Sequence, residues 1–127
     1  MKDTKPVKKR IKLLVEALRS GEYKQARDAL RVGNRYCCLG VACDVYRKET
    51  GSGEWIRSKY GPRFMSFLDE VAGMPSAVAG WYGLTGNPVL VSLNTSAVNA
   101  NDTGRTFTEI ADAFEKDYLK SKRKSRA

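Results

Sequence analysis

The four residues 106–109, TFTE, constrain the fold more than any other part of the sequence. They match the capping box, in which the Thr side chain and the Glu side chain each accept a hydrogen bond from the other residue's backbone amide. The apolar residues that follow recur at helical spacing: Phe107, Ile110, Ala111, Phe114 and Tyr118. The pattern predicts a helix over about 107–119 that packs its apolar side on a core.

A second amphipathic helix is predicted over about 7–20. Its apolar residues share one helical face: Val7, Ile11, Leu14, Val15 and Leu18. Gly21 follows as a C-cap signal. The N-terminal end of this helix is cationic, although the helix dipole favours acidic residues there. The basic side chains are therefore expected to serve solubility or a partner rather than helix stability.

The sequence between these helices predicts a hairpin and another helix. Two short apolar runs flank a Gly-Asn pair, which is a two-residue turn signal, so a short hairpin is favoured over residues 29–38. A short helix is the alternative within 22–38, because Ala26 and Leu30 have helical spacing. Residues 39–49 have apolar residues on one helical face and are predicted to form a helix that ends at Gly51. The glycine-rich residues 51–64 are predicted to be an irregular loop or a short pair of strands.

Two short helices are predicted within 64–82 from the spacing of their aromatic and aliphatic residues. The apolar run VLVSL predicts a strand over 89–93, and residues 94–104 are rich in turn residues and predict a loop.

The predicted fold is therefore α+β, a single small domain that is mainly helical with a small antiparallel sheet or hairpin built from 29–38 and 89–93. The predicted organisation is a basic N-terminal extension over 1–6, a globular domain over 7–119 and a basic flexible tail over 120–127. A chain of 127 residues can bury a core without a disulfide or a metal ion.

The net charge of +9 is concentrated at the two ends of the chain, since basic and acidic residues nearly cancel between Leu13 and Leu119. The basic ends could contact phosphates in a salt-sensitive and sequence-independent manner. The candidate nucleic-acid contacts are Lys8, Lys9, Arg10, Lys12, Lys120, Lys122, Arg123, Lys124 and Arg126. The aromatic residues are not interleaved with these basic runs, so the sequence shows no stacking platform for single strands. A solvated flexible tail is the competing interpretation.

No apolar stretch approaches the length of a transmembrane helix, and the N-terminus lacks the apolar region of a signal peptide. The sequence therefore predicts a cytoplasmic protein without a membrane partner. The odd number of cysteines then predicts free thiols, because three thiols cannot all pair within one chain.

Those three cysteines lie within one short block, RYCCLGVAC, in which Cys37, Cys38 and Cys43 flank Gly40. A zinc site needs four nitrogen or sulfur ligands, whereas the sequence has one cysteine cluster and no histidine, so the fourth ligand would be Asp44 or come from another subunit. A cysteine nucleophile usually needs a neighbouring base, and histidine is the usual one. The favoured interpretation is packing, with the thiols buried as small hydrophobes at a strand-to-helix junction.

Gly40 is interpreted as a point of close backbone approach at that junction. No metal, cofactor or catalytic residue is predicted. The alternative is an enzyme or metal-binding protein whose site is assembled from scattered residues.

Aromatic residues provide the candidate contacts with a protein partner. Trp55 and Tyr60 lie in the glycine-rich loop, where exposure would let them act as binding hot spots, although they could also cover the core. Trp81 and Tyr82 are expected to belong to the core.

The segments ALRSGEYKQARDAL, RYCCLGVACDVY, GWYGL and GRTFTEIADAFE occur in this order from about Val15 to Glu115. Together they resemble a family of small uncharacterised bacteriophage and prophage proteins with a YCCLGVxC motif and a C-terminal TFxEIAD helix. The resemblance implies a phage-encoded protein that works inside a bacterial host, and it supplies no activity or catalytic residue. Where these relatives have QGxGAL, residues 25–30 of this chain lack both glycines, which makes a helix more likely there and weakens the hairpin prediction.

The expected function is therefore a non-enzymatic binding protein that acts on a host or phage macromolecule, for example by modulating or inhibiting a host system. A nucleic-acid-binding protein that uses its basic termini is the alternative. The sequence predicts no oligomeric state.

Overall fold

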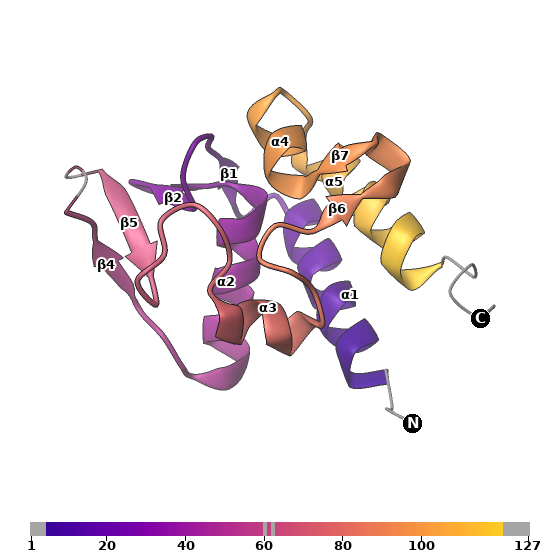
Figure 1. Cartoon of the computed structure of the whole chain (residues 1–127), viewed down its shortest axis with the longest axis horizontal. Helices are drawn as coiled ribbons and strands as arrows, with labels where there is room; N and C mark the ends of the chain where they lie inside the picture. Colours follow the sequence, from indigo (N-terminus) through magenta and orange to yellow (C-terminus); the bar gives the residue numbers. More distant parts are fainter. Residues whose placement is uncertain (1–4, 60, 62, 121–127) are drawn as a thin grey trace.

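The computed structural model describes residues 5–59, 61 and 63–120 of the chain (Figure 1). The N-terminal helix α1 (Lys5–Arg19) forms where the apolar stripe predicted it. It buries four aliphatic side chains, Ile11, Leu14, Val15 and Leu18. This face packs on the C-terminal helix α5 (Phe107–Phe114) and on helix α2 (Cys38–Thr50).

The capping box that begins α5 is present, with each partner of the Thr106–Glu109 pair bonded to the other's backbone amide. The chain continues from α5 into one π-helical turn, η2 (Glu115–Leu119), so the predicted helix over 107–119 is confirmed with a wider last turn. Arg19 at the end of α1 joins Asp112 at 2.6 Å and Glu115 at 2.9 Å. These contacts fasten the two terminal helices to each other.

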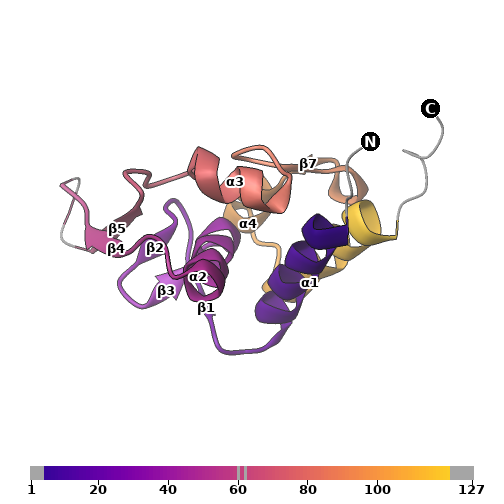
Figure 2. The same cartoon turned by 90° about the horizontal axis from the view of Figure 1, so that it is seen from below.

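Helix α2 is also confirmed, and its ends have specific caps. The Cys37 sulfur accepts a hydrogen bond from the backbone amide of Gly40 at 3.4 Å. At the other end Gly51 has φ 75°, a left-handed conformation that glycine adopts without strain. In both views α2 lies between the five-stranded sheet and α1 (Figures 1 and 2).

That sheet has the strand order β1-β3-β2-β5-β4. Its strands are short: β1 (Lys24–Gln25), β2 (Arg31–Val32), β3 (Arg35–Tyr36), β4 (Trp55–Arg57) and β5 (Phe64–Phe67). The predicted hairpin is confirmed, since β2 and β3 pair antiparallel around Gly33 and Asn34. The pair β1 and β3 is parallel, so the sheet is mixed. The glycine-rich segment 51–64 contains β4, but the antiparallel partner of β4 is β5, of which only Phe64 belongs to that segment. The prediction of a strand is therefore confirmed, and that of a strand pair within the segment is not.

The predicted helix at the start of 64–82 is wrong, because residues 64–67 form β5 between β2 and β4. Strand pairing on both sides overrides the helical spacing of the aromatic residues. The chain then reverses through Leu68 (φ 48°) and Asp69 (φ 71°), and Phe67 and Glu70 exchange backbone hydrogen bonds. The second predicted helix is α3 (Ser76–Tyr82), which ends at Gly83.

Two predictions for residues 89–104 are also wrong. The strand β6 (Val89–Leu90) pairs with β7 (Thr95–Ser96) in a separate two-stranded sheet and does not join the hairpin. The intervening residues form a 3₁₀ turn, η1 (Val91–Leu93). The predicted loop contains a further helix, α4 (Ala97–Asp102), whose N-cap Ser96 accepts a hydrogen bond from the Asn99 amide. A helix this short contains too few apolar residues for their spacing to predict it from the sequence.

Residues 26–30 connect β1 to β2 without forming a helix, contrary to the expectation from the missing glycines. Asp28 lies at the position of the second glycine expected from the resemblance, and its φ is 71°. Aspartate tolerates the left-handed region better than most residues. The chain therefore keeps a backbone conformation suited to glycine, with an aspartate in that position.

The fold is thus a small α+β domain in which helices predominate. None of the helices in the described part of the chain is both long and apolar enough to cross a membrane.

Candidate functional site

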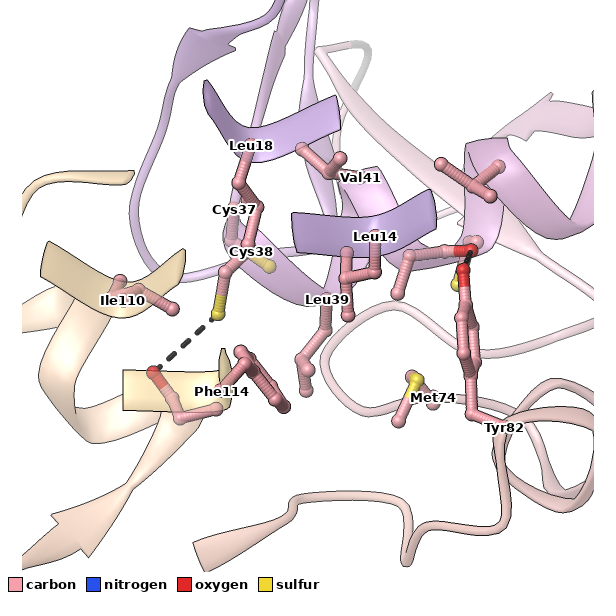
Figure 3. Close-up of a cluster of buried hydrophobic side chains, with 14 of the residues drawn as sticks. Leu14, Leu18, Cys37, Cys38, Leu39, Val41, Met74, Tyr82, Ile110 and Phe114 are labelled. Atoms are coloured by element: carbon pink, nitrogen blue, oxygen red, sulfur yellow. Dashed lines mark hydrogen bonds between the residues drawn. The ribbon is translucent and has the colours of Figure 1, made fainter. Parts of the chain in front are cut away.

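The three cysteines, which most suggested chemistry, belong to the hydrophobic core, and Figure 3 shows Cys37 and Cys38 among side chains of α1, α2 and α5. The sequence predicted burial, and all three thiols are buried and free. Burial raises the pKa of the Cys37 thiol to about 11 and also raises the pKa values of Cys38 and Cys43. The Cys38 thiol donates a hydrogen bond to the carbonyl oxygen of Ala97 at 3.5 Å. Thiols of this kind pack as small hydrophobes and are poor nucleophiles.

Gly40 lies at the point of close approach that the sequence predicted. A Cβ atom at this position would lie 1.9 Å from the carbonyl oxygen of Leu30. The same carbonyl accepts a hydrogen bond from the Cys37 amide at 3.0 Å. The cysteine block therefore joins the sheet to α2, and the junction leaves no space for a side chain at position 40.

A buried amide, which the sequence did not single out, completes this junction. Asn101 of α4 is fully buried, and its Oδ1 atom accepts hydrogen bonds from the Cys38 amide and from the Gln25 side chain. Its Nδ2 atom donates to the carbonyl oxygen of Ala26 at 2.7 Å. Asn101 therefore satisfies backbone groups of two segments distant from it in the sequence.

Asp44 of α2 is the centre of a second polar cluster. The residue is only 3% exposed. Its carboxylate accepts hydrogen bonds from Tyr23 Oη at 2.6 Å, Trp55 Nε1 at 3.0 Å and Arg47 Nε at 3.0 Å. Burial alone would raise the pKa of the Asp44 carboxyl, but these hydrogen bonds outweigh burial and hold the pKa below its usual value. The carboxylate stays charged and ties α2 to the sheet.

Trp55 is therefore not an exposed contact residue. It is half-buried, donates to Asp44, and its ring contacts those of Tyr36 and Phe67 with centroid separations of 5.7 Å and 5.0 Å. The guanidinium of Arg31 lies over both the Tyr36 and the Trp55 rings. Tyr60, the other candidate contact, lies outside the described residues.

These rings define the inner face of the five-stranded sheet, which packs on α2. Because side chains directly opposite one another in a register share a face, the register assigns the inner face to Gln25, Arg31, Tyr36, Trp55, Arg57, Met65 and Phe67. Tyr46 of α2 contacts Phe67 edge to face, at a centroid separation of 6.3 Å. The inner face is therefore largely used by the fold.

The opposite face, which we call the open face, consists of Lys24, Val32, Arg35, Ile56, Phe64 and Ser66. Lys24, Arg35 and Ile56 are exposed, and the other three are half-buried. Ile56 retains 56% of its accessible surface. Beside Ile56 and Ser66 lies a hollow of about 470 Å³. The open face therefore offers apolar and cationic side chains to solvent.

One row of the open face runs across four strands. Phe64 of β5 lies opposite Val32 of β2, Val32 lies opposite Arg35 of β3, and Arg35 lies opposite Lys24 of β1. The row thus leads from an aromatic ring to two adjacent cations. Neither cation has an ion-pair partner among the described residues.

The basic residues predicted from the N-terminal end of the chain differ in their surroundings. Lys8, Lys9 and Lys12 are exposed on α1, whose first turn contains no acidic residue. Arg10 is instead engaged by α3, since it donates to the carbonyl oxygen of Trp81 at 2.9 Å and lies 4.9 Å from the centre of its ring. It is therefore a packing residue rather than a free cation.

At the C-terminal end, Lys120 lies 4.0 Å from Glu115. Lys120 directly follows η2, which packs on α1. The remaining candidates, Lys122, Arg123, Lys124 and Arg126, lie outside the described residues. Within residues 5–59, 61 and 63–120, no three Cys, Asp or Glu residues are grouped so that they could hold a metal ion.

Residues 7–118 match the family described as Domain of unknown function (DUF8296). The chain belongs to that family. No match was found among the curated proteins or among the solved structures. The matched residues include both the cysteine block and the open face, so both features lie within the family's domain.

The sequence did not indicate the open face, since its residues come from five short strands. The signal available was local: two-residue segments in which a basic residue is followed by an apolar or aromatic one, RV and RY. Such alternation predicts a two-faced strand but not which strands become neighbours.

Proposed function

We propose that this protein is a non-enzymatic binding protein that engages a polyanionic macromolecule of a bacteriophage or its bacterial host through the open face. The row from Phe64 to Lys24 carries this proposal, because it combines apolar surface with cations that nothing in the described fold neutralises. Surfaces that combine exposed apolar and cationic groups are suited to an anionic partner.

A binding function is favoured over catalysis because the residues best suited to chemistry are used by the fold. The three thiols are buried, and burial raises their pKa values. The carboxylate of Asp44 is occupied by three hydrogen-bond donors from the chain itself. These groups therefore stabilise the fold.

The setting follows from the resemblance to small phage and prophage proteins. It supports an action in the cytoplasm of the bacterial host, where a small binding protein can modulate or inhibit a host system. Free cysteines fit a reducing compartment of this kind.

A second candidate is nucleic-acid binding through the basic termini. The observation that favours it is the cluster of exposed Lys8, Lys9 and Lys12 on α1. Polyanion binding by such a cluster would depend on charge alone.

Affinity capture from a bacterial lysate, with and without nuclease, tests the proposal. The informative comparison is between Lys24→Glu/Arg35→Glu on the open face and Lys8→Glu/Lys9→Glu on α1, which change the net charge equally. We expect specific capture by the natural protein that the open-face variant loses and the α1 variant keeps. Equal loss by both variants would favour the basic termini, and unchanged capture by the open-face variant would overturn the proposal.

A further inference from the structure

We propose that the open face binds single-stranded nucleic acid, with Phe64 stacking on a base and Arg35 and Lys24 contacting the phosphates. This inference rests on the proposed function and specifies the partner.

The row has suitable spacing for such a ligand. Neighbouring strands lie about 4.8 Å apart, so Phe64 and Arg35, which are two strands apart, are separated by roughly 10 Å along the row. Val32 lies between them and supplies an apolar floor. A base on the ring can therefore lie flat on the sheet while its backbone extends toward the cations.

The two cations are placed in a way that does not stabilise the fold. Lys24 and Arg35 lie directly opposite each other in the parallel pair β1 and β3. Like charges in this position repel each other and destabilise a sheet. Phosphates bound at the two side chains would relieve the repulsion, so the arrangement points to an anionic ligand.

The Phe64 ring is held in position by its own turn. Its backbone amide donates to the carbonyl oxygen of Gly61, and a Cβ at Gly61 would lie 3.0 Å from the ring. The ring thus lies against a residue without a side chain and remains half-exposed. A ring fixed in this way loses little conformational entropy on stacking.

Single strands are favoured over a duplex or an acidic protein because of the aromatic ring. A duplex keeps its bases stacked on each other, whereas unpaired bases stack on aromatic side chains. An acidic protein would need the cations but not the ring. Further cations lie near the row in the chain, since Arg27 follows β1 and Arg63 precedes β5, and both are exposed. They can extend the electrostatic contact along a strand of several nucleotides.

Fluorescence anisotropy with labelled 12-nucleotide DNA and RNA single strands, and with a duplex of the same length, tests the inference. We expect the natural protein to bind the single strands with micromolar affinity and to prefer them to the duplex. Phe64→Leu keeps an apolar side chain without a π-face and should weaken binding by roughly tenfold, because stacking on an aromatic ring strengthens binding by about 5- to 150-fold per base.

The salt dependence of the binding constant provides a second test, and its variants change only exposed side chains. Lys24→Gln/Arg35→Gln should reduce the slope of log K against log salt by about 1.4, since each phosphate contact with a single strand contributes about 0.7. The matched control Lys8→Gln/Lys9→Gln should leave this slope unchanged. Thermal unfolding of each variant identifies any loss of affinity that arises from unfolding.

The outcomes separate this inference from the proposed function. Equal slope changes in the open-face and α1 variants, equal binding of duplex and single strands, or an unchanged affinity of folded Phe64→Leu would overturn the inference. Binding to no oligonucleotide would also overturn it, and the proposed function would stand if the open-face variant still lost a protein partner from the lysate. Absence of both activities would overturn both proposals.

Discussion

The α-carbon of Gly40 lies so close to Leu30 that a Cβ atom on Gly40 would be 1.9 Å from the Leu30 carbonyl oxygen. This contact holds the start of α2 against the residue that precedes β2. The carbonyl also accepts the hydrogen bond from Cys37, so it cannot move away without losing that bond. The distance is therefore a fixed feature of the junction between the sheet and the helix.

Replacing Gly40 by Ala should lower the free energy of unfolding by about 3 kcal/mol or more, because the backbone must shift and core packing and a buried hydrogen bond are then lost. Urea denaturation followed by circular dichroism measures the change. Gly80→Ala is the matched control. Gly80 lies in α3, where a Cβ atom would meet no neighbouring atom within 4 Å, so alanine there should stabilise the protein by about 0.5–1 kcal/mol. Similar changes in the free energy of unfolding for Gly40→Ala and Gly80→Ala would contradict the close contact between Gly40 and Leu30.

Replacing Asp44 by Asn should destabilise the protein by about 3 kcal/mol at pH 7, because Arg47 and the two aromatic donors lose a buried charged acceptor. The pKa of Asp44 is lowered in the folded protein. Its stabilising contribution is therefore complete above the unfolded pKa of about 3.9 and is lost as the pH falls through the lower folded pKa.

Urea midpoints measured from pH 7 down to pH 2.5 test this dependence. The difference between the natural protein and Asp44→Asn should shrink as the pH falls below about 4. Glu16→Gln, an exposed acid on α1, is the control and should change the midpoint little at any pH. A difference that is constant over this pH range would show that the Asp44 charge does not stabilise the fold.

Replacing Asp28 by Gly should stabilise the protein by about 0.5 kcal/mol or leave it unchanged, since glycine adopts φ 71° without strain but loses more entropy on folding. Asp28→Val should destabilise it by about 1–2 kcal/mol, because a β-branched residue is strained in the left-handed region. Thermal unfolding of the two variants measures both effects. The backbone amide that donates to Asp102 is kept in each variant. If Asp28→Gly destabilised the protein and Asp28→Val left its stability unchanged, the left-handed backbone conformation at this position would be contradicted.

The three thiols should react slowly in the folded protein. Burial raises the pKa of Cys37 to about 11, so alkylation at pH 8 should be roughly a hundredfold slower than in the urea-unfolded chain. Mass spectrometry of samples taken during the reaction counts the labelled cysteines. Rapid labelling of any cysteine under native conditions would show that the junction opens.

The local elements of the fold could be predicted because their signals are contiguous. The capping box at Thr106 and Glu109, the apolar stripe of α1 and the Gly33-Asn34 turn each lie within a few residues of chain. Each was sufficient to place its element. The predictions failed where pairing decided the structure, as at residues 64–67, whose aromatic residues fit a helix or a strand equally well.

The candidate site was less predictable than the fold. The sequence placed the cations of interest at the ends of the chain and separated them from the aromatic residues. In the structure, pairing of β1, β3, β2 and β5 brings Lys24, Arg35 and Phe64 into one row. Register determines which side chains share a face, and register is not encoded in any one strand.

Local sequence signals were enough for the main helices, the hairpin and the burial of the cysteine block, because amphipathic spacing, capping residues and small apolar side chains act over short stretches of chain. The anchoring role of Asp44 and the unneutralised charge of the open face emerged only from the folded arrangement. Both depend on contacts between segments far apart in the chain, such as Tyr23 and Trp55 on one carboxylate and Lys24 beside Arg35. The free energy of those contacts depends on burial and neighbouring charge, which exist only once the chain has folded.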